Sequence, residues 1–162
     1  MDVPLNLEDS DPWFPETVAR EPGCGNLWRC VGCGTCTALC PVSAVHPEFS
    51  PGLILRQVLL GLKGEVLGSP LLWQCARCAR CSYYCPQEVR FLDIIQSLRR
   101  LAVAEGFVSP ELAQAVAEAD SLLAELRRRT LERLAAPGAE SLPPREVLTS
   151  TLREMDPGHE GD

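Results

Sequence analysis

The chain has 162 residues, of which 46% are hydrophobic and nine are cysteines, and its formal net charge is −7. This length suits one modest domain, and the negative balance argues against nucleic-acid binding, which needs a basic face to neutralise phosphates. The longest apolar stretch, residues 53–62, contains Arg56 and Gln57 and is too short to cross a bilayer. We therefore expect neither a nucleic-acid partner nor direct insertion into a membrane.

The first 23 residues are acidic and rich in proline, so we predict an irregular N-terminal arm over residues 1–23. They lack the basic segment and following apolar stretch that would mark a secretory signal. A cytoplasmic location is the expectation. Thiols stay reduced in that compartment, and clustered cysteines there usually bind metal or take part in catalysis.

Eight of the nine cysteines belong to a segment that occurs twice, at a fixed offset of 45 residues. The two copies read Leu27-Trp28-x-Cys30-x2-Cys33-x2-Cys36-x3-Cys40-Pro41 and Leu72-Trp73-x-Cys75-x2-Cys78-x2-Cys81-x3-Cys85-Pro86. This is the cysteine spacing of ferredoxins that hold two [4Fe–4S] clusters. The first three cysteines of a copy can reach three irons of one cube, whereas the fourth points away and ligates the other cluster.

We therefore predict two [4Fe–4S] clusters that exchange their fourth ligands. The ligands of the first cluster are Cys30, Cys33, Cys36 and Cys85, and those of the second are Cys75, Cys78, Cys81 and Cys40. Zinc or a degraded three-iron site is the alternative, although zinc prefers ligands that close one tetrahedron. An odd number of cysteines disfavours a disulfide framework.

Three further residues near the motifs carry weaker predictions. Cys24 has no counterpart in the second copy, and we predict a small buried thiol there, with a redox or ligand role as the alternative. Trp28 and Trp73 stand two residues before the first cysteine of each copy. We expect them to pack against the cluster edges and to exclude water.

The residues between the cysteines differ between the copies. Gly32 and Gly34 flank Cys33 and let the backbone adopt positive φ, which turns amides toward sulfur. The second copy has Arg77 and Ala79 instead, followed by another arginine. These arginines are either solvated surface residues, or they raise the potential of the second cluster or dock an acidic partner.

The segments after each motif have helical periodicity. Ser50-Pro51 starts a helix expected to run to Gly64, and a second amphipathic helix is expected from Phe91 to about Gly106. Period-two alternation is almost absent between the motifs, which disfavours a βαββαβ ferredoxin. We predict a mostly α protein with a helical, alpha-helical ferredoxin-type dicluster domain over residues 24–106.

The last third is expected to form a long amphipathic helix over residues 107–136, which begins at Ser109-Pro110 and stops before Pro137-Gly138. Its apolar positions alternate in steps of four and three, the pattern of a helix that packs on another helix. Packing on its own domain and docking on a neighbouring protein both remain open. Residues 137–162 are predicted to be a polar, partly disordered tail with a possible short helix from Arg145 to Met155.

Four segments together resemble the C-type subunits of heterodisulfide reductase. They are the first motif from Cys30 to Pro41, Ser50-Pro51 with Leu60-Gly61-Leu62, Trp73-x-Cys75, and Leu98-Arg-Arg-Leu101-Ala-x-x-Glu105-Gly106. The resemblance covers about residues 24–106. It implies a helical dicluster protein that passes electrons from a flavin-containing, A-type subunit to a catalytic, B-type subunit with Cys-Cys-Gly sites.

The leading hypothesis is therefore an electron-transfer subunit within a hetero-oligomeric oxidoreductase, with no substrate site of its own. The chain contains no Cys-Cys-Gly sequence, so catalytic disulfide chemistry is not encoded here. The alternatives are a freely diffusing dicluster ferredoxin, the iron–sulfur subunit of a succinate dehydrogenase-like or glycolate oxidase-like complex, and a structural or sensory iron–sulfur protein.

Overall fold

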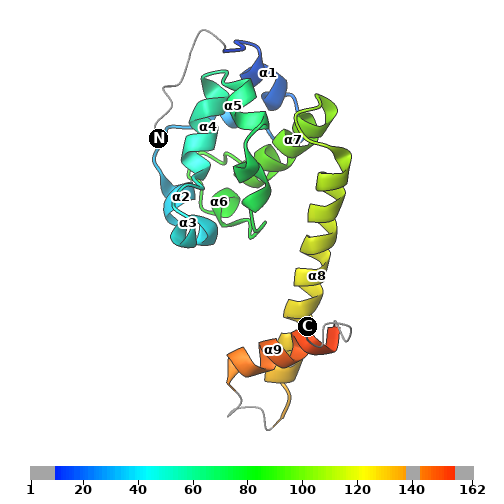
Figure 1. Cartoon of the computed structure of the whole chain (residues 1–162). Coiled ribbons are helices and arrows are strands. Elements are labelled where there is room, and N and C mark those ends of the chain that lie inside the picture. Colours follow the sequence, from blue (N-terminus) through cyan, green and yellow to red (C-terminus); the bar gives the residue numbers. More distant parts are fainter. Residues whose placement is uncertain (1–9, 138–142, 156–162) are drawn as a thin grey trace. The chain divides into compact units, whose positions relative to one another are not determined.

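The computed structural model describes residues 10–137 and 143–155, which are mostly helical and include no strand (Figure 1). The prediction of a mostly α fold with a long C-terminal helix is confirmed. The chain divides into two compact units, Met1–Pro110 and Glu111–Asp162, and each is described by itself. No helix in the described ranges is both long and apolar enough to span a membrane.

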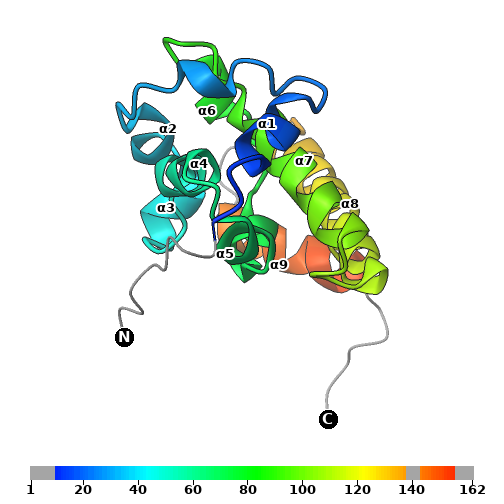
Figure 2. The same cartoon turned by 90° about the horizontal axis from the view of Figure 1, so that it is seen from above.

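The first unit is built from short helices and helical turns. In chain order they are α1 (Phe14–Ala19), η2 (Leu27–Arg29), α2 (Thr35–Ala38), α3 (Pro41–Val45), α4 (Pro51–Leu59), α5 (Lys63–Leu67), η3 (Pro70–Gln74), α6 (Arg80–Tyr83) and α7 (Phe91–Ala104). Within this unit α7 contacts α1, α5 and α6, and α4 contacts α1, α2 and α5 (Figure 2). The two longest helices, α4 and α7, therefore connect the surrounding short ones.

The start of α4 follows the prediction, but its end does not. Ser50 Oγ accepts a hydrogen bond from the Leu53 N–H at 3.2 Å, which caps the helix. The helix ends at Leu59 rather than at Gly64, because Gly61 adopts a left-handed φ of 73°. The Leu62 N–H then bonds back to the Gln57 carbonyl at 3.0 Å, as in a Schellman motif. Gly106 ends α7 in the same way.

The N-terminal arm contains one short helix, α1 (Phe14–Ala19), in its described part. Phe14 and Val18 of α1 are fully buried in the same hydrophobic core as α4 and α7. The prediction of an irregular arm is therefore wrong for residues 14–19, because the apolar side chains of α1 add to the core. Residues 1–9 lie outside the described part of the chain.

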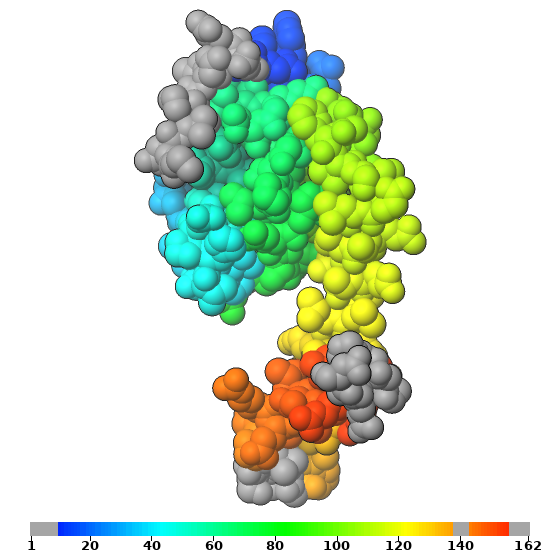
Figure 3. Space-filling model, viewed as in Figure 1, coloured from blue at the N-terminus to red at the C-terminus, as the bar shows by residue number. Residues whose placement is uncertain are grey.

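The two cysteine motifs are adjacent in the first unit although they are distant in sequence. Helix α2 of the first motif contacts α6 of the second. Figure 3 shows the cyan surface of the segment around residue 40 beside the green surface of the segment around residue 80. This adjacency is what an exchange of fourth ligands requires.

The second unit consists of α8 (Pro110–Leu134) and α9 (Pro144–Met155), with Pro110 at the boundary. Arg133 Nη1 joins the helices by donating to Thr151 Oγ1 at 3.2 Å and to Glu154 Oε1 at 2.9 Å. Residues 144–155 are thus a helix, longer by one residue than the one expected inside a partly disordered tail. The expected disorder elsewhere falls on residues 138–142 and 156–162, outside the described residues.

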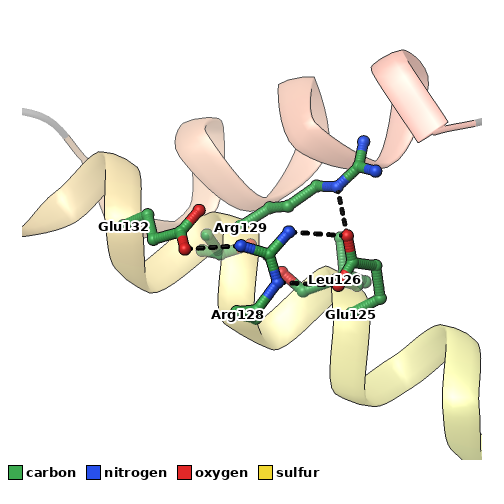
Figure 4. Close-up of polar contacts among 6 residues, drawn as sticks. Glu125, Leu126, Arg128, Arg129 and Glu132 are labelled. Atoms are coloured by element: carbon green, nitrogen blue, oxygen red, sulfur yellow. Dashed lines mark hydrogen bonds and ion pairs between the residues drawn. The ribbon is translucent and has the colours of Figure 1, made fainter.

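Helix α8 is largely exposed and carries a charge network on its surface. Thr130 is its buried residue, whereas Leu112, Leu122, Leu123 and Leu131 are exposed. Arg128 lies between Glu125 and Glu132 and pairs with both, and Arg129 also pairs with Glu125 (Figure 4). The proposed docking of this helix on a partner stays a prediction.

Candidate functional site

The first cavity of the first unit is lined by four predicted ligands. Cys30, Cys33, Cys36 and Cys85 line this cavity together with the uncharged residues Val31, Gly32, Gly34, Thr35, Gly52, Leu55, Gln87, Val89 and Phe91. Three of the cysteines come from the first motif and Cys85 comes from the second. The structure thus brings together the four residues that the spacing assigns to one cluster.

A second cavity is lined by the other four cysteines. Cys40, Cys75, Cys78 and Cys81 line it together with the uncharged residues Pro41, Val42, Phe49, Pro51, Ala76, Ala79, Phe91 and Leu92. Here Cys40 is the contribution of the first motif. Phe91 lines both cavities and is 1% exposed, so its ring forms part of a shared wall.

The first turns of α4 and α7 reach the cavities. Gly52 of α4 lines the first cavity and Leu92 of α7 lines the second, and each is the second residue of its helix. Helix N-termini carry partial positive charge, which favours a nearby anionic group. This orientation suits a cluster with four thiolates, whose net charge is negative.

Each of these helix starts is held by a hydroxyl from the motif before it. The Gly52 N–H donates to Thr37 Oγ1 at 2.9 Å, and the Leu92 N–H donates to Ser82 Oγ at 3.1 Å. Thr37 and Ser82 directly follow the third cysteine of their copies and are themselves 45 residues apart. Sequence reasoning missed this pair, although their equal position after Cys-x2-Cys-x2-Cys was a visible signal.

The loops between the cysteines have the same backbone conformation in both copies. Gly32 and Gly34 have φ of 67° and 78°, and Arg77 and Ala79 have φ of 53° and 61°. The predicted positive φ of the glycines is confirmed, and the second copy adopts it with side chains for which that conformation is strained. Arg77 and the neighbouring Arg80 are exposed, and their role in docking or redox tuning stays a prediction.

The surroundings shift the pKa values of the cysteine thiols in different directions. Burial raises the pKa of Cys36 and of Cys75, and burial together with the nearby Cys75 raises the pKa of Cys81 to about 11. A hydrogen bond with the Thr35 hydroxyl, 3.4 Å away, lowers the pKa of the exposed Cys33. Burial thus disfavours the thiolate form of these half-buried thiols, whereas a coordinated metal would favour it.

The donor chemistry fits iron–sulfur clusters. Each cavity has four thiols and an otherwise uncharged lining. A residue from the first turn of a helix, α4 or α7, is part of each lining. In the described residues no group of three or more His, Cys, Asp or Glu side chains is placed to hold a single metal ion. The thiols are instead distributed around two spaces.

Cys24 and the two tryptophans lie outside the cavities. Cys24 is 1% exposed, its Sγ lies 3.3 Å from Ser97 Oγ, and burial raises its pKa. The prediction of a small buried thiol is confirmed. Trp28 is 56% exposed, and Trp73 packs against the apolar core. Neither lines a cavity, and their packing against the cluster edges stays a prediction.

One cation beside the second motif was also missed. Arg99 of α7 donates from Nε to the Leu72 carbonyl at 2.7 Å and from Nη2 to the Cys75 carbonyl at 3.4 Å. Its guanidinium carbon lies 5.4 Å from the centre of the Trp73 ring. In the sequence Arg99 is an ordinary polar position of an amphipathic helix, and only the packing of α7 on η3 reveals the contact.

Comparison with known proteins defines the class of the first unit. A family described as a 4Fe–4S dicluster domain matches residues 29–90, a range that contains all eight cavity cysteines. The chain thus carries a helical dicluster domain for two [4Fe–4S] clusters. This domain supports an iron–sulfur electron-transfer role.

The chain is similar to proteins named as C-type subunits of heterodisulfide reductases, which confirms the resemblance seen in the sequence. The C-type chain of the H2:CoB–CoM heterodisulfide, ferredoxin reductase of Methanothermobacter thermautotrophicus is 31% identical over 100 residues, which cover 62% of this chain and 53% of that protein. The C-type iron–sulfur chain of the CoB–CoM heterodisulfide reductase of Methanopyrus kandleri is 34% identical over 115 residues, covering 67% and 59%.

A third relative is the second C-type iron–sulfur chain of the CoB–CoM heterodisulfide reductase of Methanocaldococcus jannaschii, which is 42% identical over 81 residues, or 50% of this chain and 42% of that protein. The matched region thus spans about half the length of these relatives.

Proposed function

We propose that this chain is the electron-relay subunit of a heterodisulfide reductase-like, multi-subunit oxidoreductase. The observation that carries the proposal is the pair of adjacent cavities, each lined by three cysteines of one motif and one of the other. When bound there, two [4Fe–4S] clusters supply one-electron oxidation and reduction steps. The chain's own residues provide the ligands, an uncharged lining and the partial positive charge of two helix N-termini.

The proposed ligands follow the two cavity linings. Cys30, Cys33, Cys36 and Cys85 hold the first cluster, and Cys75, Cys78, Cys81 and Cys40 hold the second. Because Cys85 and Cys40 are each donated across the domain, the two sites are tied together. Phe91 is buried and lines both sites, so it forms part of the wall that they share. The starts of α4 and α7 offset the negative charge of the thiolates.

The proposed partners are a flavin-containing protein, like the A-type subunits of heterodisulfide reductase, and a catalytic protein with Cys-Cys-Gly sites, like the B-type subunits. The names of the relatives support membership in such an assembly. The lack of a Cys-Cys-Gly sequence in this chain supports a division of labour, in which the catalytic step occurs on another protein of the complex. The cytoplasmic location of this complex stays a prediction.

The direct test is strictly anaerobic purification of the full tagged chain from its native cells, followed by identification of the proteins that accompany it. We expect a flavoprotein and a protein with Cys-Cys-Gly sequences in a stable complex. A monomer that reduces several acceptors without forming a complex would instead support the free ferredoxin. Recovery of a succinate dehydrogenase-like or glycolate oxidase-like partner would overturn the heterodisulfide reductase assignment.

A matched control separates specific assembly from adhesion. The leucines exposed on α8, such as Leu122 and Leu123, are apolar enough to bind other proteins non-specifically. The double variant Leu122→Ser/Leu123→Ser should therefore be purified in parallel. Partners that assemble through the dicluster domain remain with this variant, whereas partners that require α8 are lost.

A further inference from the structure

The lead-in segment of the second motif, residues 72–75, is held by a cation from a different element. This segment covers the end of η3 and the first cysteine of the second cavity. Arg99, eight residues into α7, donates to carbonyls at both ends of it, 2.7 Å from Leu72 O and 3.4 Å from Cys75 O. Between those ends, the guanidinium lies over the Trp73 ring at 5.4 Å.

These contacts use the features that distinguish arginine from other cations. A planar guanidinium can donate through two nitrogens at once and stack on an aromatic face, which an ammonium group cannot reproduce in one geometry. Arg99 is half-buried, so its charge is less screened than that of the exposed arginines beside Cys78.

Helix α4, which follows the first motif as α7 follows the second, has a leucine at the position that corresponds to Arg99. Gly52 of α4 and Leu92 of α7 correspond, because both are second residues of their helices and both donate to the hydroxyl after a third cysteine. Arg99 lies seven residues after Leu92, and the residue seven after Gly52 is Leu59. The two halves of the domain therefore differ by one half-buried positive charge at matching places.

We propose that Arg99 is a positioning residue that sets the second cluster apart from the first. Its fork fixes the peptide that carries Cys75, and its charge raises the reduction potential of the cluster in the cavity of Cys40, Cys75, Cys78 and Cys81. Adding an electron makes a cluster more negative, so a nearby fixed cation stabilises the reduced form more than the oxidised one. This inference rests on the proposed function, because it requires both clusters to be bound.

The test compares Arg99→Gln, Arg99→Lys and the parent chain by redox titration followed by electron paramagnetic resonance. We expect Arg99→Gln to lower the midpoint potential of one cluster and to leave the other unchanged. The affected cluster is identified as the one whose signal Cys78→Ser perturbs. Arg99→Lys keeps the charge but not the fork, so its potential should lie between those of the parent and Arg99→Gln.

The matched control is Arg100→Gln, which removes the same charge from the next residue of α7. Arg100 is exposed and pairs with Glu21 at 3.0 Å rather than with the lead-in segment. We expect both potentials to stay at their parent values in this variant. Equal shifts in Arg99→Gln and Arg100→Gln would reduce the effect to overall charge and would overturn the proposal.

Two further results are decisive. Unchanged potentials of both clusters in Arg99→Gln, with eight irons still bound, would refute the role of Arg99 while leaving the proposed relay intact. Absence of both clusters from the parent chain would refute the relay itself. If Arg99→Gln binds only the first cluster, the potential of the second cluster is measured in Arg99→Lys instead. A potential equal to that of the parent chain would then contradict a role for the two-nitrogen contact of Arg99.

Discussion

Ala79 holds a backbone conformation that Gly34, its counterpart in the first motif, adopts without strain. The two φ angles are 61° and 78°, and no atom lies within 4 Å of a methyl group built on Gly34. The protein atoms therefore oppose a side chain here only through the backbone conformation, at a cost of about 1–2 kcal/mol. We expect Gly34→Ala to destabilise the loaded protein by about 1 kcal/mol and Ala79→Gly to stabilise it by a similar amount.

Anaerobic denaturant unfolding of both variants, with iron content checked in parallel, measures these differences. The paired design uses each motif as the control for the other. A stabilising Gly34→Ala, or a destabilising Ala79→Gly, would contradict the idea that left-handed φ limits this loop.

Sequence reasoning at this scale succeeded where spacing alone decides. The cysteine groups and the positive φ of Gly32 and Gly34 follow from local spacing and from the freedom of glycine. The repeat also contains the signal for the helix-capping role of Thr37 and Ser82, which occupy the same position in the two copies. Arg99 was not accessible, since its partners Leu72 and Cys75 lie more than twenty residues away and depend on how α7 packs.

At the scale of elements, the turn between α4 and α5 anchors the start of the described chain. The Asp11 N–H donates to the Gly61 carbonyl at 2.8 Å, and a methyl group on Gly61 would lie 2.4 Å from the Asp11 carbonyl oxygen. Gly61 also has a φ of 73°. Gly61→Ala therefore combines a steric clash with backbone strain, and we expect a loss of about 3 kcal/mol.

Gly64 supplies the control for that substitution. It lies inside α5, and no atom is within 4 Å of a methyl group built on it. Gly64→Ala should stabilise the helix by about 0.5–1 kcal/mol. Thermal unfolding of the two variants under identical conditions should thus give shifts of opposite sign, and shifts of the same sign would refute the explanation.

The charge network of α8 gives a pH prediction. Hydrogen bonds from Arg128 and Arg129 lower the pKa of Glu125 to about 2. A carboxylate with a lowered pKa stabilises the folded form above its unfolded pKa of about 4.3, and this contribution is lost as pH falls toward 2. Glu125→Gln should therefore increase amide exchange in α8 equally at pH 5 and pH 7.

Hydrogen exchange corrected for intrinsic rates measures that effect, which will be small because the network is exposed. Glu118→Gln, on the same helix, is the control for loss of one charge. If the difference between Glu125→Gln and the parent, expected at pH 5 and pH 7, has already vanished at about pH 3, the arginines do not lower the pKa of this carboxylate.

The helix boundaries show why elements were only partly predictable. Ser50-Pro51 and Gly106 mark a start and an end that local chemistry enforces, and both were located correctly. Gly61 ended α4 earlier than expected, because the apolar periodicity continues through Leu62 into the next helix. Helix α1 was missed because Phe14 and Val18 gain their stability from tertiary burial, which composition does not reveal.

For the molecule as a whole, the metal sites and the two units lead to a prediction about cluster removal. Six of the cavity cysteines pack against the hydrophobic core of the first unit, so the clusters complete that core. Anaerobic chelation of iron should strongly reduce hydrogen-exchange protection of α2, α4, α6 and α7. Protection of α9, which belongs to the second unit, should change little.

Mass spectrometry of the loaded and stripped chain distinguishes these regions. A uniform loss of protection across both units would show that they unfold together. Unchanged protection of α4 and α7 would show that the clusters add nothing to the stability of the first unit.

The central claim is the exchange of Cys40 and Cys85 between the two clusters. Four single serine variants test it by paramagnetic resonance of the reduced protein. They are Cys33→Ser, Cys85→Ser, Cys78→Ser and Cys40→Ser. Cys33 and Cys78 are matched, because both are exposed second cysteines of their motifs, and each reports which signal belongs to its own cavity.

We predict that Cys85→Ser alters the same signal as Cys33→Ser, and that Cys40→Ser alters the same signal as Cys78→Ser. If Cys85→Ser instead perturbs the signal changed by Cys78→Ser, each motif holds its own cluster with all four of its cysteines, and the exchange is contradicted.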